Sequence, residues 1–431
     1  MFKFILKQKV YLFLVLMIGM LASCSSDDDM VIGDITSPTG ELTKTIPWDE
    51  TEASISFTAN SAWTASVAEV GTRAATSISW LKITVPKGGA GDVKMPLLLS
   101  KNDNETYREA EVTIKCGEKC VTVTIHQEAN PDAVKMMDAS SISNYSMYIT
   151  PGTWNEGFEK GPDYMLRSDA RWSWWRMKQS EHFFVFWEPG FGDNPNAESV
   201  PEALRVDIDD LLQKAEQFYK TNVEKLGMAT VGQGKSVLDN HKMQIYLLYQ
   251  TEWLATGSGY DDKIGALWVN PSTCKPVGST IGHEIGHSFQ YQVSADKLFT
   301  GEATPIDKAD GSQLVPAGFR YGFGENGAGG CAYWEQCAQW QSFQDYPNEC
   351  FDQDAHYAVW LKNHHRHFNH EFMRYASYWF QYWFTEKHGI ESYARIWKES
   401  KYPEDPLQTY MRIYCNNSLD ALYKDLYAYS A

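Results

Sequence analysis

The segment that most restricts the fold of this chain is Gly282–Gln290, which reads GHEIGHSFQ. Residues four positions apart project from the same face of a helix, so the imidazoles of His283 and His287 can reach a single metal ion. Three apolar residues share this spacing on the nearly opposite face: Ile281, Ile285 and Phe289. They would anchor the helix in a core. We therefore predict a helix over about residues 276–292 with a metal-facing side and a buried side.

The carboxylate of Glu284 adds a further chemical group to this helix. It lies about 100° round the helix from His283, close enough to touch a metal-bound water without binding the metal itself. Zinc accepts imidazole and carboxylate ligands in a tetrahedral site that leaves one position for water, and it lowers the pKa of that water from about 15.7 to about 7. Glu284 could take the water's proton and later protonate a leaving amine. The motif predicts Zn²⁺-dependent hydrolysis with Glu284 as the catalytic residue.

The elements around this helix favour one family of folds. Apolar residues at steps of three and four predict a long amphipathic helix over 201–228, and the runs 243–249 and 265–271 are typical of strands. This order of elements resembles that of the zincin metallopeptidases: an amphipathic helix, a strand, an edge strand and then a helix with an HExxH motif. The resemblance covers about residues 200–400. It implies that 131–431 form an α+β domain that hydrolyses peptide bonds with one zinc ion.

A third metal ligand is predicted in the segment Ala332–Trp340, which reads AYWEQCAQW. This segment resembles the second zinc helix of the gluzincin group of zincins, which implies Glu335 as the ligand. Gln339 stands where a carboxylate often supports a ligating histidine in that group, and its amide can still hydrogen-bond such a histidine. Two rivals remain. Glu302 suits the shorter spacing of enhancin-like mucin-degrading peptidases but has loop-like neighbours, and Glu325 lies among glycines, as in a turn.

Several other residues are candidates for contacts with a substrate or a metal. The hydroxyl of Tyr375 or Tyr378 could stabilise an oxyanion, and the alternative is that both pack the core or wall the cleft. The resemblance to zincins implies that Trp268 and Asn270, on the predicted edge strand, lie against an extended substrate. The histidine-rich tract 364–370 could bind a metal of its own, but it lacks a fixed ligand spacing, and a solvated loop is the preferred interpretation.

The N-terminal residues predict export and a lipid anchor. Three lysines precede an apolar run over 10–21, which is shorter than the roughly 20 residues of a membrane-spanning helix and is typical of a signal peptide over 1–23. Leu-Ala-Ser before Cys24 resembles the bacterial lipobox, whose cysteine is acylated; a plain signal peptide is the alternative. The acidic and polar residues 24–40 would form a tether. They resemble the starts of gut-bacterial surface lipoproteins, which implies localisation at the outer membrane, facing the exterior.

Residues 41–128 predict an all-β domain, because short runs of alternating apolar and polar residues are separated by turn-forming residues. The segments around Trp63 and Trp80, a glycine-rich loop, Arg108 and the closing TIHQ that ends at Gln127 resemble a BACON domain. That family is an immunoglobulin-like module of gut-bacterial surface proteins. The resemblance implies a carbohydrate- or mucin-binding module or only a spacer, and the spacer is slightly favoured. Both tryptophans are expected in the core rather than on a sugar-binding face.

Charge and cysteine usage limit the partners and the cross-links. The formal net charge is −17, so a nucleic acid is not an expected partner, since phosphate binding needs a basic surface. Cys116 and Cys120 flank a turn between two strand-like runs, a spacing that suits a cross-strand disulfide in an oxidising compartment. The pairing of the other cysteines cannot be deduced. Apart from Cys24 the chain has an odd number of cysteines, which implies at least one free thiol.

These patterns together predict a multidomain chain, with an all-β immunoglobulin-like sandwich followed by an α+β zincin-like domain. The expected function is that of a cell-surface zinc metallopeptidase acting on a protein or glycoprotein, including mucin-type substrates. The alternative from a different class is a non-catalytic surface lipoprotein that binds glycan or mucin. A third alternative is zinc-dependent hydrolysis of an ester or amide bond in a cell-wall fragment. An essential Glu284 would distinguish an enzyme from a binding protein.

Overall fold

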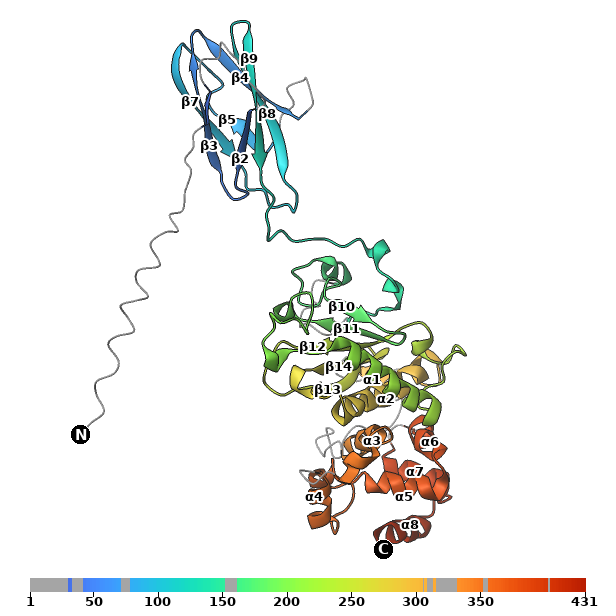
Figure 1. Ribbon diagram of the computed structural model, residues 1–431. Helices are drawn as coiled ribbons and strands as arrows, with labels where there is room; N and C mark the ends of the chain where they lie inside the picture. The colour runs from blue at the N-terminus through green and yellow to red at the C-terminus, as the bar shows by residue number, and fades with distance from the viewer. Residues whose placement is uncertain are drawn as a thin grey trace, which may run out of the picture. The chain divides into compact units, whose positions relative to one another are not determined.

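The computed structural model of the 431-residue chain describes residues 30–32, 42–70, 78–151, 161–304, 306–307, 313–314, 332–351, 356–401 and 404–431. The chain divides into two compact units, Met1–Val134 and Lys135–Ala431. The first is rich in β-strands, and the second combines strands with helices (Figure 1). The predicted signal peptide and Cys24 lie outside the described residues. In the part of the chain that is described, no helix is long and apolar enough to cross a membrane.

The N-terminal unit is a sandwich of two sheets around its own core. One sheet has the strand order β1 (Met30–Ile32), β3 (Glu52–Ala59), β7 (Gly91–Leu99) and β5 (Leu81–Ile83). The other has the order β2 (Leu42–Ile46), β9 (Lys119–Gln127), β8 (Arg108–Cys116), β4 (Trp63–Glu69) and β6 (Lys87–Gly88). Met30–Ile32, which lie within the predicted tether, pair in parallel with β3.

The residues that resemble the BACON pattern hold this sandwich together. Trp63 is buried and packs edge-on against Phe57, with ring centroids 5.0 Å apart. The guanidinium of Arg108 lies 4.5 Å above the half-buried ring of Trp80, and its Nε donates a 2.9 Å hydrogen bond to the buried Gln127. Trp63 is a core residue, as predicted, and one face of Trp80 is covered by Arg108.

The predicted disulfide between Cys116 and Cys120 is wrong. Cys116 stands opposite Lys119 across the hairpin, whereas Cys120 stands opposite Lys115, so the two thiols project to different faces of the sheet. Cys116 is buried and Cys120 is exposed, and neither of them forms a disulfide. The hairpin turn is one residue shorter than a Cys–Cys register would need. Cys331 lies outside the described residues.

The C-terminal unit is built on a mixed five-stranded sheet. Its strand order is β10 (Met177–Gln179), β11 (Phe183–Trp187), β12 (Met243–Leu247), β14 (Ile264–Val269) and β13 (Ala255–Tyr260). The central strands β11, β12 and β14 run parallel, and every residue in them is buried, as expected where both faces of a sheet are covered. The outer strands β10 and β13 run antiparallel to their neighbours.

Different parts of the chain cover the two faces of this sheet. Helices α1 (Ile208–Lys220) and α2 (Ser279–Phe299) lie together under one face (Figure 1). Aromatic residues from the irregular segment before β10 pack on the other face, where Tyr148 and Trp174 contact Phe184 and Phe186. The predicted helix over 201–228 begins later than expected, since Asp207 caps the N-terminus of α1. The predicted helix with the HExxH motif is present and extends to Phe299.

The predicted edge strand is wrong. The segment 265–271 contributes to β14, which lies inside the sheet, and the true edge is β13. β13 reads ATGSGY and has no apolar alternation, so it carries no strand signal of its own. Trp268 and Asn270 are both buried and therefore do not lie on an open edge.

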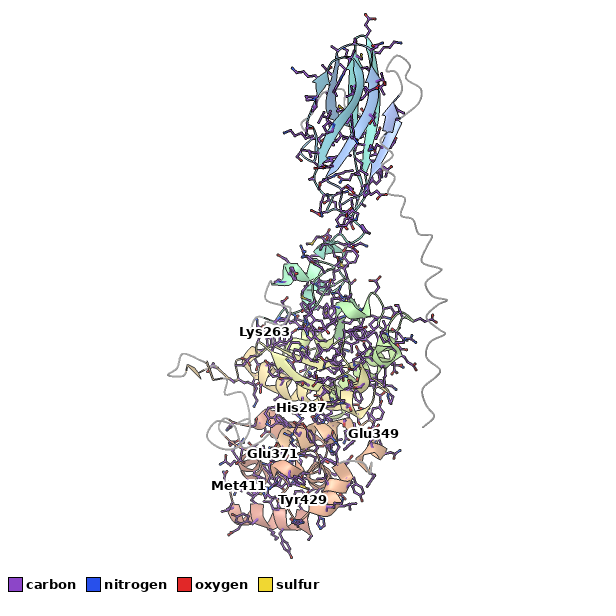
Figure 2. The ribbon with its side chains drawn as sticks, turned by 90° about the vertical axis from the view of Figure 1, so that its left-hand side faces the viewer. Lys263, His287, Glu349, Glu371, Met411 and Tyr429 are labelled. Carbon is purple, nitrogen blue, oxygen red and sulfur yellow. The ribbon has the colours of Figure 1, made fainter. Side chains whose placement is uncertain are left out.

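The rest of the C-terminal unit is mainly helical and lies on the far side of α2 from the sheet (Figure 1). It comprises α3 (Ala332–Ser342), α4 (His356–Asn363), α5 (Trp379–His388), α6 (Glu391–Glu399), α7 (Pro406–Tyr414) and α8 (Leu419–Ser430). A short ladder also joins β15 (Ile306–Asp307) to β16 (Gln313–Leu314). Figure 2 shows His287 between the layer that holds Lys263 and the helices below it.

Helix α2 makes close contacts with its neighbours at two glycines. A Cβ added to Gly257 on β13 would lie 2.0 Å from the carbonyl oxygen of Glu284. A Cβ added to Gly286 would lie 3.1 Å from the side-chain oxygen of Gln341 and 3.3 Å from the Cα of Ala338, both on α3. These glycines let α2 lie directly against the edge strand on one side and against α3 on another.

We predict that Gly257→Ala destabilises the C-terminal unit, because the backbone of Glu284 on α2 leaves no room for a methyl group. The expected loss in the free energy of unfolding is about 1–3 kcal/mol or more, as in overpacked cores. Thr256→Ala is the matched control, since Thr256 is the exposed neighbour on the same strand. It should cost less than about 1 kcal/mol. Equal effects of the two substitutions in denaturant unfolding would contradict the close contact.

Candidate metal centre

Three side chains that could bind a metal ion meet between α2 and α3. His283 and His287 come from successive turns of α2, and Glu335 comes from the first turn of α3. Oε2 of Glu335 lies 3.1 Å from Nε2 of His283 and 3.0 Å from Nε2 of His287. One ligand atom from each residue lies within 4.8 Å of the others. Two ligands of a tetrahedral zinc ion are about 3.3 Å apart, so only a small adjustment would seat an ion among these atoms.

The other ring nitrogen of each histidine is held by an amide oxygen. Nδ1 of His283 donates to Oε1 of Gln339 at 2.7 Å, and Nδ1 of His287 donates to Oε1 of Gln290 at 2.9 Å. A proton on Nδ1 leaves Nε2 of a neutral imidazole with a lone pair. Two lone pairs and a carboxylate oxygen then point at one another, and a cation satisfies all three. The residues present therefore fit a divalent metal ion.

The ionisation of these groups reflects their mutual contacts. Burial raises the pKa of the Glu335 carboxyl, but the hydrogen bonds and charges of the two histidines outweigh burial and hold this pKa well below its usual range. Burial lowers the pKa of His287, but the hydrogen bonds and charges of Glu335, Glu284 and Gln290 together outweigh burial, so the net change is upward. Because a metal binds only the unprotonated nitrogen, protons compete with the metal at His287. The affinity for a metal should therefore fall as the pH falls.

Glu284 lies beside this group on α2. Only 6% of its surface is exposed, and none of the described residues donates a hydrogen bond to its carboxylate. Its charge contributes to the raised pKa of His287, which places it close to that imidazole. A buried carboxylate beside a metal-binding group is suited to accept a proton from a bound water.

The two tyrosines predicted as helpers differ in position. The hydroxyl of Tyr375 donates to Oε1 of Glu335 at 3.2 Å, and its ring lies 5.9 Å from that of His283. Tyr378 is fully buried, and its hydroxyl donates to the backbone oxygen of Cys350. Tyr375 therefore belongs to the site, whereas Tyr378 belongs to the core.

Sequence reasoning missed His356 and Gln290. His356 begins α4, and its ring lies 5.5 Å from that of Tyr375. Burial, followed by the charge of His283, lowers the pKa of His356. Nothing in its local sequence marks it, because the fold brings it to the site from a separate helix. Gln290 could have been found, since it lies three positions after His287 on the same helix.

Glu302 and the histidine tract take no part in this group. Glu302 is exposed in the turn after α2, and Glu325 lies outside the described residues. The histidines of 364–370 are exposed in a turn, as the preferred interpretation held. Among the described residues, the group of His283, His287 and Glu335 is the one that could hold a metal ion.

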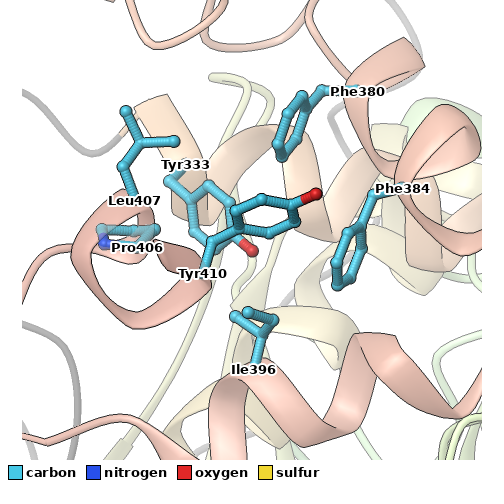
Figure 3. Close-up of a pocket in the computed structure, with 7 residues that line it drawn as sticks. All are labelled: Tyr333, Phe380, Phe384, Ile396, Pro406, Leu407 and Tyr410. Carbon is cyan, nitrogen blue, oxygen red and sulfur yellow. The ribbon is translucent and has the colours of Figure 1, made fainter. Parts of the chain in front are cut away.

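A cavity elsewhere in the helical layer is unsuited to a ligand. It measures about 10 Å³, room for roughly one water molecule. Figure 3 shows its mostly apolar lining: Tyr333, Phe380, Phe384, Ile396, Pro406, Leu407 and Tyr410. We regard it as a gap in the packing of α3, α5, α6 and α7.

The fold and the site define a two-unit protein with an N-terminal β-sandwich and a C-terminal α+β unit that carries a candidate metal centre. The chain belongs to the family described as "Family of unknown function (DUF6055)", which matches residues 139–431. Residues 64–128 match BACON, described as "Putative binding domain, N-terminal", which confirms the predicted N-terminal domain. The matched families do not include a zincin or another metallopeptidase. No curated protein matches the chain.

Three solved structures share limited similarity with the chain. A protein from Bacteroides thetaiotaomicron, solved by NMR, is 15% identical over 22% of this chain and 83% of its own, with a TM-score of 0.17. The E. coli chaperone DraB is 9% identical over 24% and 60%, with a TM-score of 0.18. The Bacteroides ovatus GH5 xyloglucanase is 16% identical over 59% and 61%, with a TM-score of 0.17. Scores this low carry no inference about function.

We predict that the protein binds one equivalent of zinc and that Glu335→Gln weakens this binding by more than about 100-fold, because the loss of a ligand should exceed the roughly 10–100-fold effect of an outer-shell change. Affinity would be measured by competition with a chelator. Glu302→Gln, the rival acidic residue, should bind zinc as the wild type does. Wild-type affinity in Glu335→Gln would show that the ion is held elsewhere.

Proposed function

We propose that this protein is a zinc-dependent peptidase held at the bacterial cell surface. The observation that carries the proposal is the convergence of two Nε2 atoms and a carboxylate oxygen, with Glu284 on the same helix as both histidines. A helix with HExxH under a mixed sheet, followed by a helix that supplies a glutamate, also resembles the zincin arrangement. The predicted lipobox at Cys24 supports a lipid anchor and a location at the outer membrane.

Each residue of the site would have a distinct chemical role. A bound zinc ion would supply a Lewis acid and a coordinated water with a pKa near 7 rather than about 15.7. His283, His287 and Glu335 would hold the ion. Glu284 would accept a proton from the attacking water at a carboxylate oxygen and pass it to the leaving nitrogen. The hydroxyl of Tyr375 would give up its bond to Glu335 and donate its one proton to the oxygen on which negative charge develops.

The edge strand β13 supports a peptide as the substrate. Gly257 on this strand lies against the backbone of Glu284, so the strand passes beside the residue that carries the proposed catalytic carboxylate. An extended chain that pairs with an edge strand gains main-chain hydrogen bonds without regard to its side chains. A protein or glycoprotein segment bound along β13 would therefore present its backbone to the metal centre.

The decisive test of this proposal is Glu284→Gln. We expect this variant to keep its zinc and to lose proteolysis by about 10²–10⁴-fold, the usual contribution of a general base. Casein and mucin would serve as substrates, and new amino termini would be the measured product. Glu302→Gln is the matched control and should cleave normally. If Glu284→Gln digests both substrates at the wild-type rate, the peptidase mechanism is wrong.

A second candidate function, glycan binding by the sandwich, is favoured by a groove on the N-terminal unit. The groove encloses about 610 Å³ and is lined by Pro47, Trp48, Asp49, Tyr107, His126, Glu128, Ala129 and Pro131. Tyr107 is 59% exposed and packs on His126 with ring centroids 4.6 Å apart. Exposed aromatic faces beside a few carboxylates suit a ligand with both apolar faces and hydroxyl groups.

For this second candidate we predict that mucin retards the protein in affinity gel electrophoresis and that Tyr107→Ala removes the retardation. The physical reason is the loss of the exposed ring that would pack against a sugar. Leu98→Ala, on β7, removes another exposed apolar side chain outside the groove and should have no effect. Retardation that survives Tyr107→Ala would exclude this groove, and its absence in the wild type would favour a spacer.

A further inference from the structure

One segment of the C-terminal unit is basic although the chain as a whole is acidic, with a formal net charge of −17. It covers residues 356–375, from the start of α4 to the turn before α5. Its cations Lys362, Arg366 and Arg374 are opposed by a single carboxylate, that of Glu371. Five of the eleven histidines of the chain also lie in it: His356, His364, His365, His367 and His370. We call residues 356–375 the basic segment.

Both ends of the basic segment lie at the candidate metal centre. The ring of His356, its first residue, is 5.5 Å from the ring of Tyr375, its last residue. The hydroxyl of Tyr375 donates to Oε1 of Glu335 at 3.2 Å. The guanidinium of Arg374 lies over the ring of Tyr375, 4.9 Å from the ring centroid. The segment therefore leaves the metal centre and returns to it, and a single aromatic ring separates Arg374 from Glu335.

Two buried side chains fix the position of the basic segment. Phe368 stacks on Phe380 of α5 with ring centroids 4.1 Å apart, and both rings are buried. Met373 is buried as well, close to the end of the segment. Lys362 and Arg366 are exposed. Because apolar side chains anchor the backbone in the core, the cations are presented to solvent from a defined surface beside the metal centre.

The guanidinium of Arg366 contacts an amide, an imidazole and a phenyl ring. Its Nε donates to Oδ1 of Asn363 at 3.3 Å, and a terminal nitrogen lies 3.4 Å from Nε2 of His370. It lies over the ring of Phe372 at 5.3 Å, and that ring is 58% exposed. A planar guanidinium can donate two parallel hydrogen bonds to one carboxylate. Arg366 is therefore suited to bind a carboxylate from outside the chain.

Arg374 already has an acidic neighbour, but the pair is exposed. Its terminal nitrogen lies 2.8 Å from Oε1 of Glu371, and the two side chains are 40% and 46% exposed. Ion pairs in contact with solvent are weak, because water competes for both partners. A carboxylate on a ligand can therefore displace Glu371 from Arg374 at little cost.

We infer that the basic segment selects acidic polypeptide segments, with carboxylates of the substrate bound by Arg366 and Arg374. The inference rests on the proposed function and deepens it, because it names the class of peptide that the site takes. An extended peptide advances about 3.3 Å per residue, so a carboxylate two or three residues from the cleaved bond lies about 7–10 Å from that bond. Arg374, one ring beyond Glu335, suits this reach.

The charge of the whole chain explains why an acidic peptide needs a dedicated surface. A strongly acidic protein repels acidic peptides and attracts basic ones over most of its surface. At physiological ionic strength charges more than about 8 Å apart are largely screened, so the residues nearest to the ligand decide the preference. A basic segment at the metal centre reverses the preference at the place where the substrate binds.

The test compares two dye-labelled peptides that share one sequence, except that the glutamates of one are glutamines in the other. Fluorescence anisotropy gives the affinity of the metal-free protein for each. We expect the wild type to bind the glutamate peptide about 3–10-fold more tightly, as for one or two exposed ion pairs. The difference should disappear at a salt concentration of about 1 M, where charges are screened beyond about 3 Å.

Substitutions in the ion pair should move this preference in opposite directions. Arg374→Gln should lower it by about 2–5-fold, whereas Glu371→Gln should raise it, because it removes the competing carboxylate. A matched pair on α6 provides the controls: Arg395 lies 2.7 Å from Glu399 and 5.5 Å from the ring centroid of Tyr414. Arg395→Gln and Glu399→Gln change the net charge equally but lie outside the basic segment, so both should keep the wild-type preference.

Equal affinities of the wild type for the two peptides would overturn the inference, and so would an equal loss in Arg395→Gln and Arg374→Gln. Binding of a sulfated glycan without binding of the glutamate peptide would overturn it as well, since the partner would then be a glycan. If the protein cleaves neither casein nor mucin but the preference depends on Arg374, the peptidase proposal is wrong and the acidic-peptide surface stands. If cleavage requires Glu284 and the preference is missing, the peptidase proposal stands and the inference is wrong.

Discussion

The contact between α2 and α3 is the constraint on which the candidate site depends. His283 and His287 can face one point from a single helix, but Glu335 reaches that point only because α3 packs closely on α2. Gly286 lies at this contact, where an added Cβ would come within 3.1 Å of the side-chain oxygen of Gln341 and 3.3 Å of the Cα of Ala338. The same contact brings Gln339 to His283 and Gln341 to Gln290. One helix crossing therefore supplies both the carboxylate and the amides that orient the imidazoles.

The sequence predicted those parts of the molecule that a local pattern determines. The helix with HExxH follows from a four-residue spacing of apolar and polar side chains, and Ile281, Ile285 and Phe289 are indeed fully buried. The sandwich follows from alternation and from the BACON pattern. The segment around Glu335 resembles the second zinc helix of gluzincins, whereas Glu302 has loop-like neighbours, and the structure places Glu335 alone of these two beside the histidines.

Features that depend on contacts between distant segments could not be predicted. β13 is a strand because it pairs with β14 at the end of the sheet. Its glycines do not favour a strand, but they allow α2 to pack closely against it. Nε2 of Gln341 donates to Oδ1 of Asn222 at 2.6 Å, but the two residues lie on different helices and no spacing links them. The disulfide prediction failed for a related reason: a one-residue difference in the turn reverses the face on which Cys120 lies.

The use of amides, rather than carboxylates, behind both histidines has an electrostatic consequence. A carboxylate at Gln290 or Gln339 would make the imidazoles more basic, and it would add charge to a buried region that already holds Glu284 and Glu335. Like charges in a poorly solvated site raise one another's pKa, and one of them would take up a proton. A protonated Glu284 could no longer accept a proton from water. Neutral amides fix the orientation of the imidazoles by hydrogen bonds alone, and they add no negative charge beside Glu284 and Glu335.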